Sequence, residues 1–156
     1  MLETIRMYWE AVCRVLAWIP VIWRDRDFDY VFLYKILRYK LSRMEKACSI
    51  AVDDHTAKEL WLAQALLKRL EKDNYTELEE RDHERRWGML DIKFTETCNP
   101  HVNLGEFYYS KATTPEENER ANKEASEIGR RADARRENDL DYLFKLMREC
   151  VQRWWI

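Results

Sequence analysis

The stretch from residue 114 to residue 154, TPEENERANKEASEIGRRADARRENDLDYLFKLMRECVQRW, decides the fold class. Its start is clearly marked, because Thr114 can cap free helix amides, Pro115 suits the first helical position and Glu117 completes a capping box. No further proline follows. The pattern therefore predicts one helix of about 40 residues, about 60 Å long at about 1.5 Å per residue.

The two halves of this helix carry different apolar stripes. The stripe of the first half is sparse and small, and consists of Ala121, Ala125, Ile128 and Ala132. The stripe of the second half is larger, and consists of Leu140, Phe144, Met147, Val151 and Trp154. We expect the second half to face the core. The first half is either solvated or packs closely through its alanines against another helix or subunit, so it is the best place for a subunit or host contact.

Four shorter helices are predicted before this one. The first has a stripe at alternating steps of three and four, formed by Leu2, Ile5, Trp9, Val12, Leu16 and Ile19. Pro20 is expected to end it. Its polar face carries both charge signs without an excess of cations, which favours a core-facing helix over a membrane-surface helix. The others are expected over about 28–50, 54–72 and 76–87, the last with Thr76 and Glu79 at capping-box spacing.

The apolar residues of the second and third helices follow the same helical spacing. Those of the second are Leu33, Ile36, Leu37, Leu41, Met44 and Cys48, and those of the third are Leu60, Ala63, Leu67 and Leu70. Between residues 89 and 110 the period changes to two, around the turn Asn99-Pro100, which predicts a small β-hairpin insertion. We therefore expect one mainly α domain over 1–156, a bundle of about five helices with a long C-terminal helix.

Composition narrows the function classes. Apolar residues make up 46% and charged residues 36% of the chain, and the net charge is −2 with both signs interleaved. Without a basic excess, a nucleic-acid partner is disfavoured. The four cysteines are widely spaced, the N-terminus does not read as a secretory signal, and no apolar run is long enough to span a bilayer. We expect a cytoplasmic protein without a membrane partner.

No motif in the sequence specifies a reaction, a metal or a cofactor. GxSxG, HExxH and Walker patterns are absent, so no catalytic residue is assigned and enzymatic activity is not supported. The alternating aspartates at 25–29 do not form a calcium loop, because Tyr30 and Ile36 stand where glycine and glutamate are needed. Cys98 and His101 lack a second pair of zinc ligands, and we predict no metal there.

One set of residues suggests a ligand. Arg26, Tyr30, Tyr34 and Arg38 follow one another at intervals of four and therefore line one edge of the second helix. Two rings flanked by guanidinium groups suit a planar anionic ligand such as a nucleotide, which Trp23 or Trp155 would close off. The alternative is that these side chains border the core, with their rings buried and their polar tips in water.

Three regions of the chain resemble a family of small uncharacterised proteins encoded by tailed phages and prophages of gut bacteria. They are IPVIWRDRDFDY at 19–30 with KLSRM at 40–44, RWG at 86–88, and DLDYLFKL at 139–146 with WW at 154–155. The chain departs from the family at Phe28, where tryptophan is usual, and at Ile156, where an acidic residue is usual.

The resemblance implies a phage accessory protein in the host cytoplasm and supplies no activity. We expect a non-catalytic homo-oligomer that binds and sequesters a nucleotide-like host immune signal through Arg26, Tyr30, Tyr34 and Arg38, with Trp23 or Trp155 beside them. The alternatives are a protein-binding module that blocks a host factor, and a nucleic-acid-associated phage protein.

Overall fold

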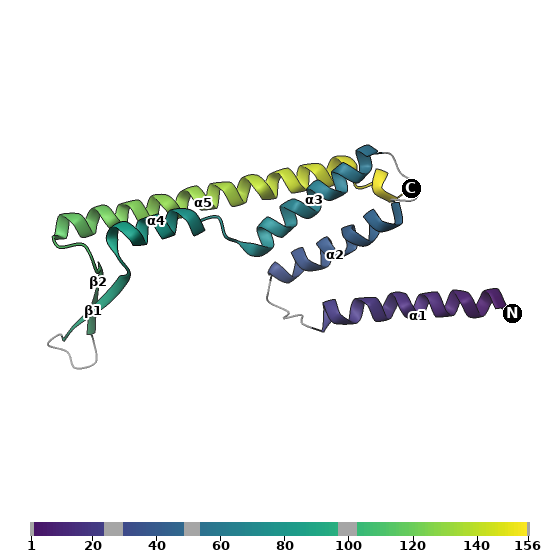
Figure 1. The fold of residues 1–156 in the computed structure, drawn as a ribbon, viewed down its shortest axis with the longest axis horizontal. Helices are drawn as coiled ribbons and strands as arrows, with labels where there is room; N and C mark the ends of the chain where they lie inside the picture. Colours follow the sequence, from purple (N-terminus) through teal and green to yellow (C-terminus); the bar gives the residue numbers. More distant parts are fainter. Residues whose placement is uncertain (1, 24–29, 49–53, 97–102, 156) are drawn as a thin grey trace. The chain divides into compact units, whose positions relative to one another are not determined.

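The computed structural model describes residues 2–23, 30–48, 54–96 and 103–155. Within these ranges five α-helices, one β-hairpin and one short 3-10 turn follow one another (Figure 1). In chain order they are α1 (Leu2–Ile22), α2 (Tyr30–Cys48), α3 (Asp54–Lys72), α4 (Glu77–Trp87), β1 (Leu90–Glu96), β2 (Asn103–Tyr109), α5 (Pro115–Cys150) and the turn Arg153–Trp155. The prediction of a mainly α fold with a long C-terminal helix and a hairpin is confirmed.

The chain divides into two compact units. Unit 1 comprises Met1–Asp73 and Asn138–Ile156, and unit 2 comprises Asn74–Glu137. The two units are described separately below, and the expectation of one domain over 1–156 stays a prediction.

The core of unit 1 lies between α2 and α3. The predicted stripe of α3 is confirmed, since Leu60, Ala63, Leu67 and Leu70 are all buried. Arg38 bonds to Glu71, and Gln64 bonds to Glu45, so the two helices run antiparallel. On α2 the buried residues include Phe32, Leu41 and Met44, whereas Leu33 is exposed. Ile36 and Leu37 are half-buried, so within the predicted α2 stripe Leu33 is the described side chain that contradicts the prediction, and the side chain of Cys48 lies outside the described residues.

The C-terminal part of α5 belongs to unit 1, and its buried face matches the predicted one only in part. Trp154 is buried as predicted, and Leu140, Met147 and Val151 are half-buried. Leu143, Cys150 and Trp154 are buried, and Asp139 is buried beside Arg69 of α3 at 3.0 Å. Phe144, predicted to be in the core, is 62% exposed. Adjacent helical residues point about 100° apart, so burial of Leu143 turns Phe144 away from the core.

Helix α1 corrects two predictions. It does not end at Pro20 but continues to Ile22, and the amide of Trp23 still donates to the Ile19 carbonyl at 2.8 Å. Its apolar stripe does not face a core either, because Ile5, Val12 and the other described members are exposed. A single proline removes one backbone hydrogen bond, and here the helix tolerates that loss.

The contact between α1 and α2 is made by residues outside the stripe. The hydroxyl of Tyr39 donates to the Ala17 carbonyl at 2.6 Å, and the rings of Trp18 and Tyr39 meet edge to face at 4.9 Å. The side of α1 that touches its own chain is therefore not the side with the repeating apolar residues.

Unit 2 is built from α4, the hairpin and the first half of α5. The alanine stripe of α5 is buried in this unit, since Ala121, Ile128 and Ala132 are almost fully covered. Nε2 of His83 on α4 lies 3.0 Å from the Ala121 carbonyl, so α4 packs against this face. Of the two alternatives, close packing against another helix is the one found. The stripe is therefore covered within its own chain, and the expectation of a subunit or host contact on the first half of α5 stays a prediction.

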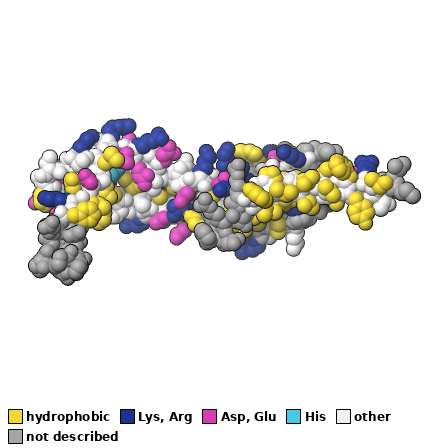
Figure 2. Space-filling model, turned by 90° about the horizontal axis from the view of Figure 1, so that it is seen from below, with side chains coloured by type: hydrophobic (Ala, Val, Ile, Leu, Met, Phe, Trp, Pro, Cys, Tyr) yellow, Lys and Arg dark blue, Asp and Glu magenta, His cyan; other side chains and the backbone are white. Residues whose placement is uncertain are grey.

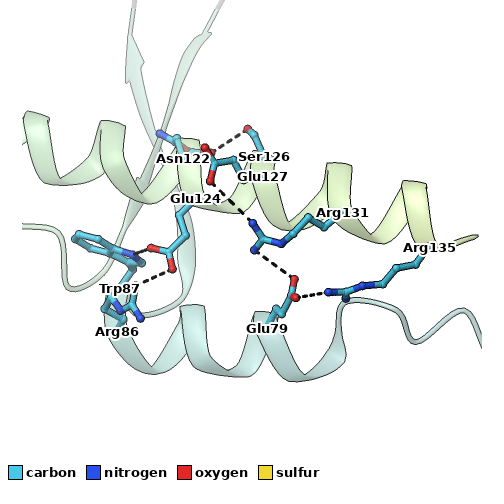
Figure 3. Close-up of polar contacts among 9 residues, drawn as sticks. All are labelled: Glu79, Arg86, Trp87, Asn122, Glu124, Ser126, Glu127, Arg131 and Arg135. Carbon is cyan, nitrogen blue, oxygen red and sulfur yellow. Dashed lines mark hydrogen bonds and ion pairs between the residues drawn. The ribbon is translucent and has the colours of Figure 1, made fainter.

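Charged side chains join α4 to α5 around this apolar face (Figure 3). Glu79 accepts from Arg135 at 2.7 Å and from Arg131 at 3.4 Å, while Glu124 accepts from Trp87 Nε1 and Arg86, each at 2.7 Å. The hydrogen bond from Arg135 lowers the pKa of the Glu79 carboxyl, although burial opposes it. These contacts hold α4 along the polar first half of α5, which has few large apolar residues of its own.

Of the two capping boxes predicted in unit 2, the one at the start of α5 is present and the one at the start of α4 is not. The capping box of α5 is confirmed, because the Glu117 amide donates to Thr114 Oγ1 and the Glu117 carboxylate accepts from the Thr113 and Thr114 amides. Thr76 makes no side-chain cap, so the capping box predicted for α4 was wrong. Gly88 links α4 to β1 at φ +82°, where a Cβ would lie 2.1 Å from Ser110 Oγ.

Candidate functional site

The predicted ligand edge of α2 is only partly described. Arg26 lies outside the described residues, and so does the side chain of Trp155. Tyr30 is 63% exposed, and its ring meets that of Tyr34 edge to face, with centroids 6.0 Å apart. The two rings are therefore neighbours on one side of α2, as their spacing predicted.

Arg38 is engaged by a residue that the sequence pattern did not indicate. Its Nε and Nη2 both lie 2.8 Å from Oε2 of Glu71 on α3. This ion pair satisfies part of the guanidinium group, so a ligand phosphate would have to compete with a carboxylate that is itself only partly exposed. The predicted nucleotide contact at Arg38 is weakened by this arrangement.

Helix α1 presents the most continuous apolar surface among the described helices. The large side chains at its stripe positions Ile5, Trp9, Val12, Leu16 and Ile19 are between 46% and 67% exposed. Figure 2 shows the hydrophobic side chains gathered in a band over this part of the chain. A row of exposed apolar side chains is costly to leave in water.

The C-terminal end of α1 is also hollowed. A cavity of about 770 Å³ is lined by Val15, Trp18, Ile19, Ile22 and Trp23. Trp23, which we predicted to close a ligand site, is 85% exposed at its rim. Every lining side chain is apolar, so the cavity suits an apolar side chain of a partner far better than a phosphate group.

A polar cluster closes the end of unit 1. Glu59 of α3 is 7% exposed and accepts from Trp154 Nε1 at 3.0 Å and Arg153 Nη2 at 2.6 Å. His55 Nδ1 lies 3.0 Å from Oε1 of Glu59, the same oxygen that accepts from Arg153. The thiol of Cys150 is buried beside them, 3.1 Å from Arg153 Nη2.

This cluster has the residue types of a Cys-His-acid site, but its electrostatics favour a structural role. Burial, together with the hydrogen bond and charge of Glu59, raises the pKa of the Cys150 thiol. Since the thiolate is the nucleophilic form, this environment works against a reactive cysteine. The carboxylate instead ties the last turn of the chain to α3.

Sequence reasoning missed this cluster. A signal was present, since Glu59 precedes Ala63 by four residues and so lies in phase with the buried stripe of α3. The donors Arg153 and Trp154 are more than 90 residues away, and no local pattern connects them to Glu59.

Neither a metal-binding cluster nor a membrane-spanning helix is found among the described residues. Over the ranges that the structure describes, no group of three or more His, Cys, Asp or Glu side chains is placed to bind a metal ion. Cys98 and His101 lie outside those ranges. No described helix combines the length and apolar character needed to cross a bilayer.

Comparison with known proteins identifies no relative. No protein-family model matches the chain, and neither the curated proteins nor the solved structures contain a match.

The first prediction concerns the indole of Trp154. Trp154→Phe keeps an aromatic side chain at this position but removes the indole Nε1–H that donates to the buried carboxylate of Glu59. The free energy of unfolding should therefore fall by about 1–3 kcal/mol. Trp61→Phe is the matched control, because Trp61 is 63% exposed on the same helix as Glu59. Its effect should stay within about 0.5 kcal/mol. Urea unfolding measures both values. An equal decrease in the free energy of unfolding for Trp154→Phe and Trp61→Phe would contradict the role assigned to Trp154.

The second prediction concerns pH. Burial raises the pKa of Glu59, but the hydrogen bonds from Trp154 and Cys150 and the charges of Arg153 and His55 outweigh it, so the net pKa lies below the ordinary 4.5. The ionised carboxylate therefore stabilises unit 1 fully above pH 4.5. This stabilisation is lost as the pH falls through the lowered folded-state pKa.

Glu59→Gln should accordingly be less stable at neutral pH and should lose less stability on acidification below pH 4.5. Urea unfolding at a series of pH values measures both. Parallel pH curves for the variant and the natural chain would contradict the assignment.

Proposed function

We propose that this chain is a non-catalytic phage accessory protein that acts by binding a host protein through the apolar end of α1. The observation that carries the proposal is the cavity lined by Val15, Trp18, Ile19, Ile22 and Trp23. An apolar cavity on an exposed helix suits a bulky aliphatic or aromatic anchor from a partner segment.

Two further features agree with a binding role and give no support to a catalytic one. The buried thiol of Cys150 has a raised pKa, and the ion pairs of unit 2 join α4 to α5 within that unit. The sequence resemblance to phage and prophage proteins suggests that the partner is a host factor in the cytoplasm, such as a defence protein. Binding alone would block such a factor, and no reaction is required.

The third prediction tests this surface directly. A photoreactive phenylalanine derivative replaces Trp23 in one chain and Trp61 in another, since both tryptophans are exposed but only Trp23 borders the cavity. Illumination of host cells should give one defined adduct at position 23, identified by mass spectrometry, and none at position 61. The purified partner should bind the natural chain and the Trp61→Ser variant, and should lose binding to Trp23→Ser. Binding that survives Trp23→Ser would overturn the proposal.

A second candidate is the sequestration of a nucleotide-like host signal. It is favoured by the exposed ring of Tyr30 beside Tyr34, on which a base could stack. In this version Glu71 holds Arg38 until a ligand phosphate displaces it. Arg26 would complete the ligand edge, as the sequence spacing predicts, and Trp155 would close the site.

The fourth prediction separates this candidate from the first. Calorimetric titration with cyclic nucleotides and ADP-ribose should show binding that Tyr30→Ala weakens about tenfold or more, through loss of stacking. Glu71→Gln should strengthen the same binding, because it frees Arg38. Tyr142→Ala on α5 serves as the control for removal of an exposed tyrosine. Absence of binding, or insensitivity to Tyr30→Ala, would remove the candidate.

A further inference from the structure

The apolar stripe of α1 has the spacing of a coiled-coil seam. From Ile5 through Trp9, Val12 and Leu16, the steps alternate between four and three residues, a repeat of 3.5 residues. A helix that packs on a globular core usually has a broader, less regular face, whereas this repeat is the one that keeps two helices in contact along their length. These four residues are called the seam below, and all are exposed.

The chain itself does not cover the seam. Within the described residues, Ala17 and Trp18 of α1 contact Tyr39 of α2. In heptad terms these two residues occupy the outer positions b and c, whereas the seam occupies a and d. The described residues therefore leave the seam exposed, and a second molecule packed on it would remove it from water.

We propose that the seam pairs with the seam of a second copy of this chain, with the two α1 helices antiparallel. In an antiparallel pair each a position lies opposite a d position, so Trp9 meets Val12 of the second copy and Ile5 meets Leu16 of the second copy. The pairing is centred between residues 10 and 11, and the same contacts recur on both sides of a two-fold axis.

Side-chain size supports this orientation. In a parallel pair two Trp9 rings would occupy one layer, whereas the antiparallel pair places each ring opposite the smaller Val12. The flanking g positions behave in the same way, because Tyr8 comes to lie near Val15 of the second copy. Both of these residues are exposed. Trp9 and Tyr8 therefore each meet a smaller valine in the antiparallel pair, and Ile5 meets a side chain of similar size in Leu16.

Charge also permits self-pairing. Glu3, Glu10 and Arg14 occupy positions b and f, away from the seam, so no like charges face each other across it. The remaining charge, Arg6 beside the seam, has its Nε bonded to Glu10 of the same helix at 3.0 Å. A polar face with two acidic and two basic residues does not suit an anionic lipid surface, which attracts a cationic face. Antiparallel helix dipoles add a small favourable term.

This pairing goes beyond the proposed host contact, and of the five residues that line the cavity only Val15 also takes part in the pairing. Trp18, Ile22 and Trp23, which line the cavity, lie at the two ends of the paired segment and outside its layers. A dimer would therefore present two such cavities. Loss of self-pairing and loss of the host contact are separable, because the seam variants leave Trp23 intact.

The fifth prediction concerns oligomeric state. Sedimentation equilibrium of the natural full chain should show a dimer. Val12→Glu should raise its dissociation constant about a hundredfold or more, because two unpaired carboxylates would enter the seam. Met7→Glu is the matched control, since Met7 is an exposed apolar residue at the outer position f. It should leave the dimer unchanged. A monomeric natural chain, a dimer that survives Val12→Glu, or equal loss in Met7→Glu would each overturn the proposal.

Orientation and occupant are tested by two further measurements. In a Cys13→Ser background, mixing Trp9→Cys chains with Val12→Cys chains should give the mixed disulfide on oxidation. A disulfide between two Trp9→Cys chains would overturn the antiparallel pairing. Sedimentation with vesicles of phosphatidylcholine and phosphatidylglycerol should leave the natural chain in solution. Vesicle binding that Val12→Glu abolishes would make a lipid surface the occupant and overturn the proposal.

Discussion

Removal of apolar surface from water is the constraint on which this structure depends. The apolar stripe of α1 does not meet this constraint, because its described side chains are exposed. The stripe of α3 is buried in unit 1, and the alanine stripe of α5 is buried in unit 2. The stripe of α1 has an equally regular pattern but stays exposed. The same physical rule that explains the other helices supports our proposal that another molecule covers this stripe of α1.

Local chemistry made much of the fold predictable. The cap at Thr114 and Glu117, the stripe of α3 and the period-two pattern of the hairpin each depend on residues a few positions apart. Such signals act through backbone geometry, which is the same in any helix or strand. They do not reveal what a face will contact. For that reason the stripes of α1 and α3 have similar spacing in the sequence, although the stripe of α3 is buried in the structure and the stripe of α1 is exposed.

The errors have the same origin. Burial of Leu143 in place of Phe144 is a rotation of about 100° about the helix axis, which several adjacent apolar residues on α5 leave undetermined. Contacts between distant residues were also beyond local reasoning. Glu71 engages Arg38, and Arg153 with Trp154 engages Glu59, in pairs separated by 33 to 95 residues. The prediction that Tyr30 and Tyr34 are neighbours was correct. The same prediction did not include the carboxylate of Glu71, which bonds to Arg38.

The central claim is that α1 is stabilised by contacts outside its own chain, and amide hydrogen exchange at several protein concentrations tests it most directly. Because only an intermolecular contact depends on concentration, protection of α1 should rise with concentration while protection of α3 stays constant. Protection of α1 that is independent of concentration would contradict the account, because α1 would then be held by its own chain alone.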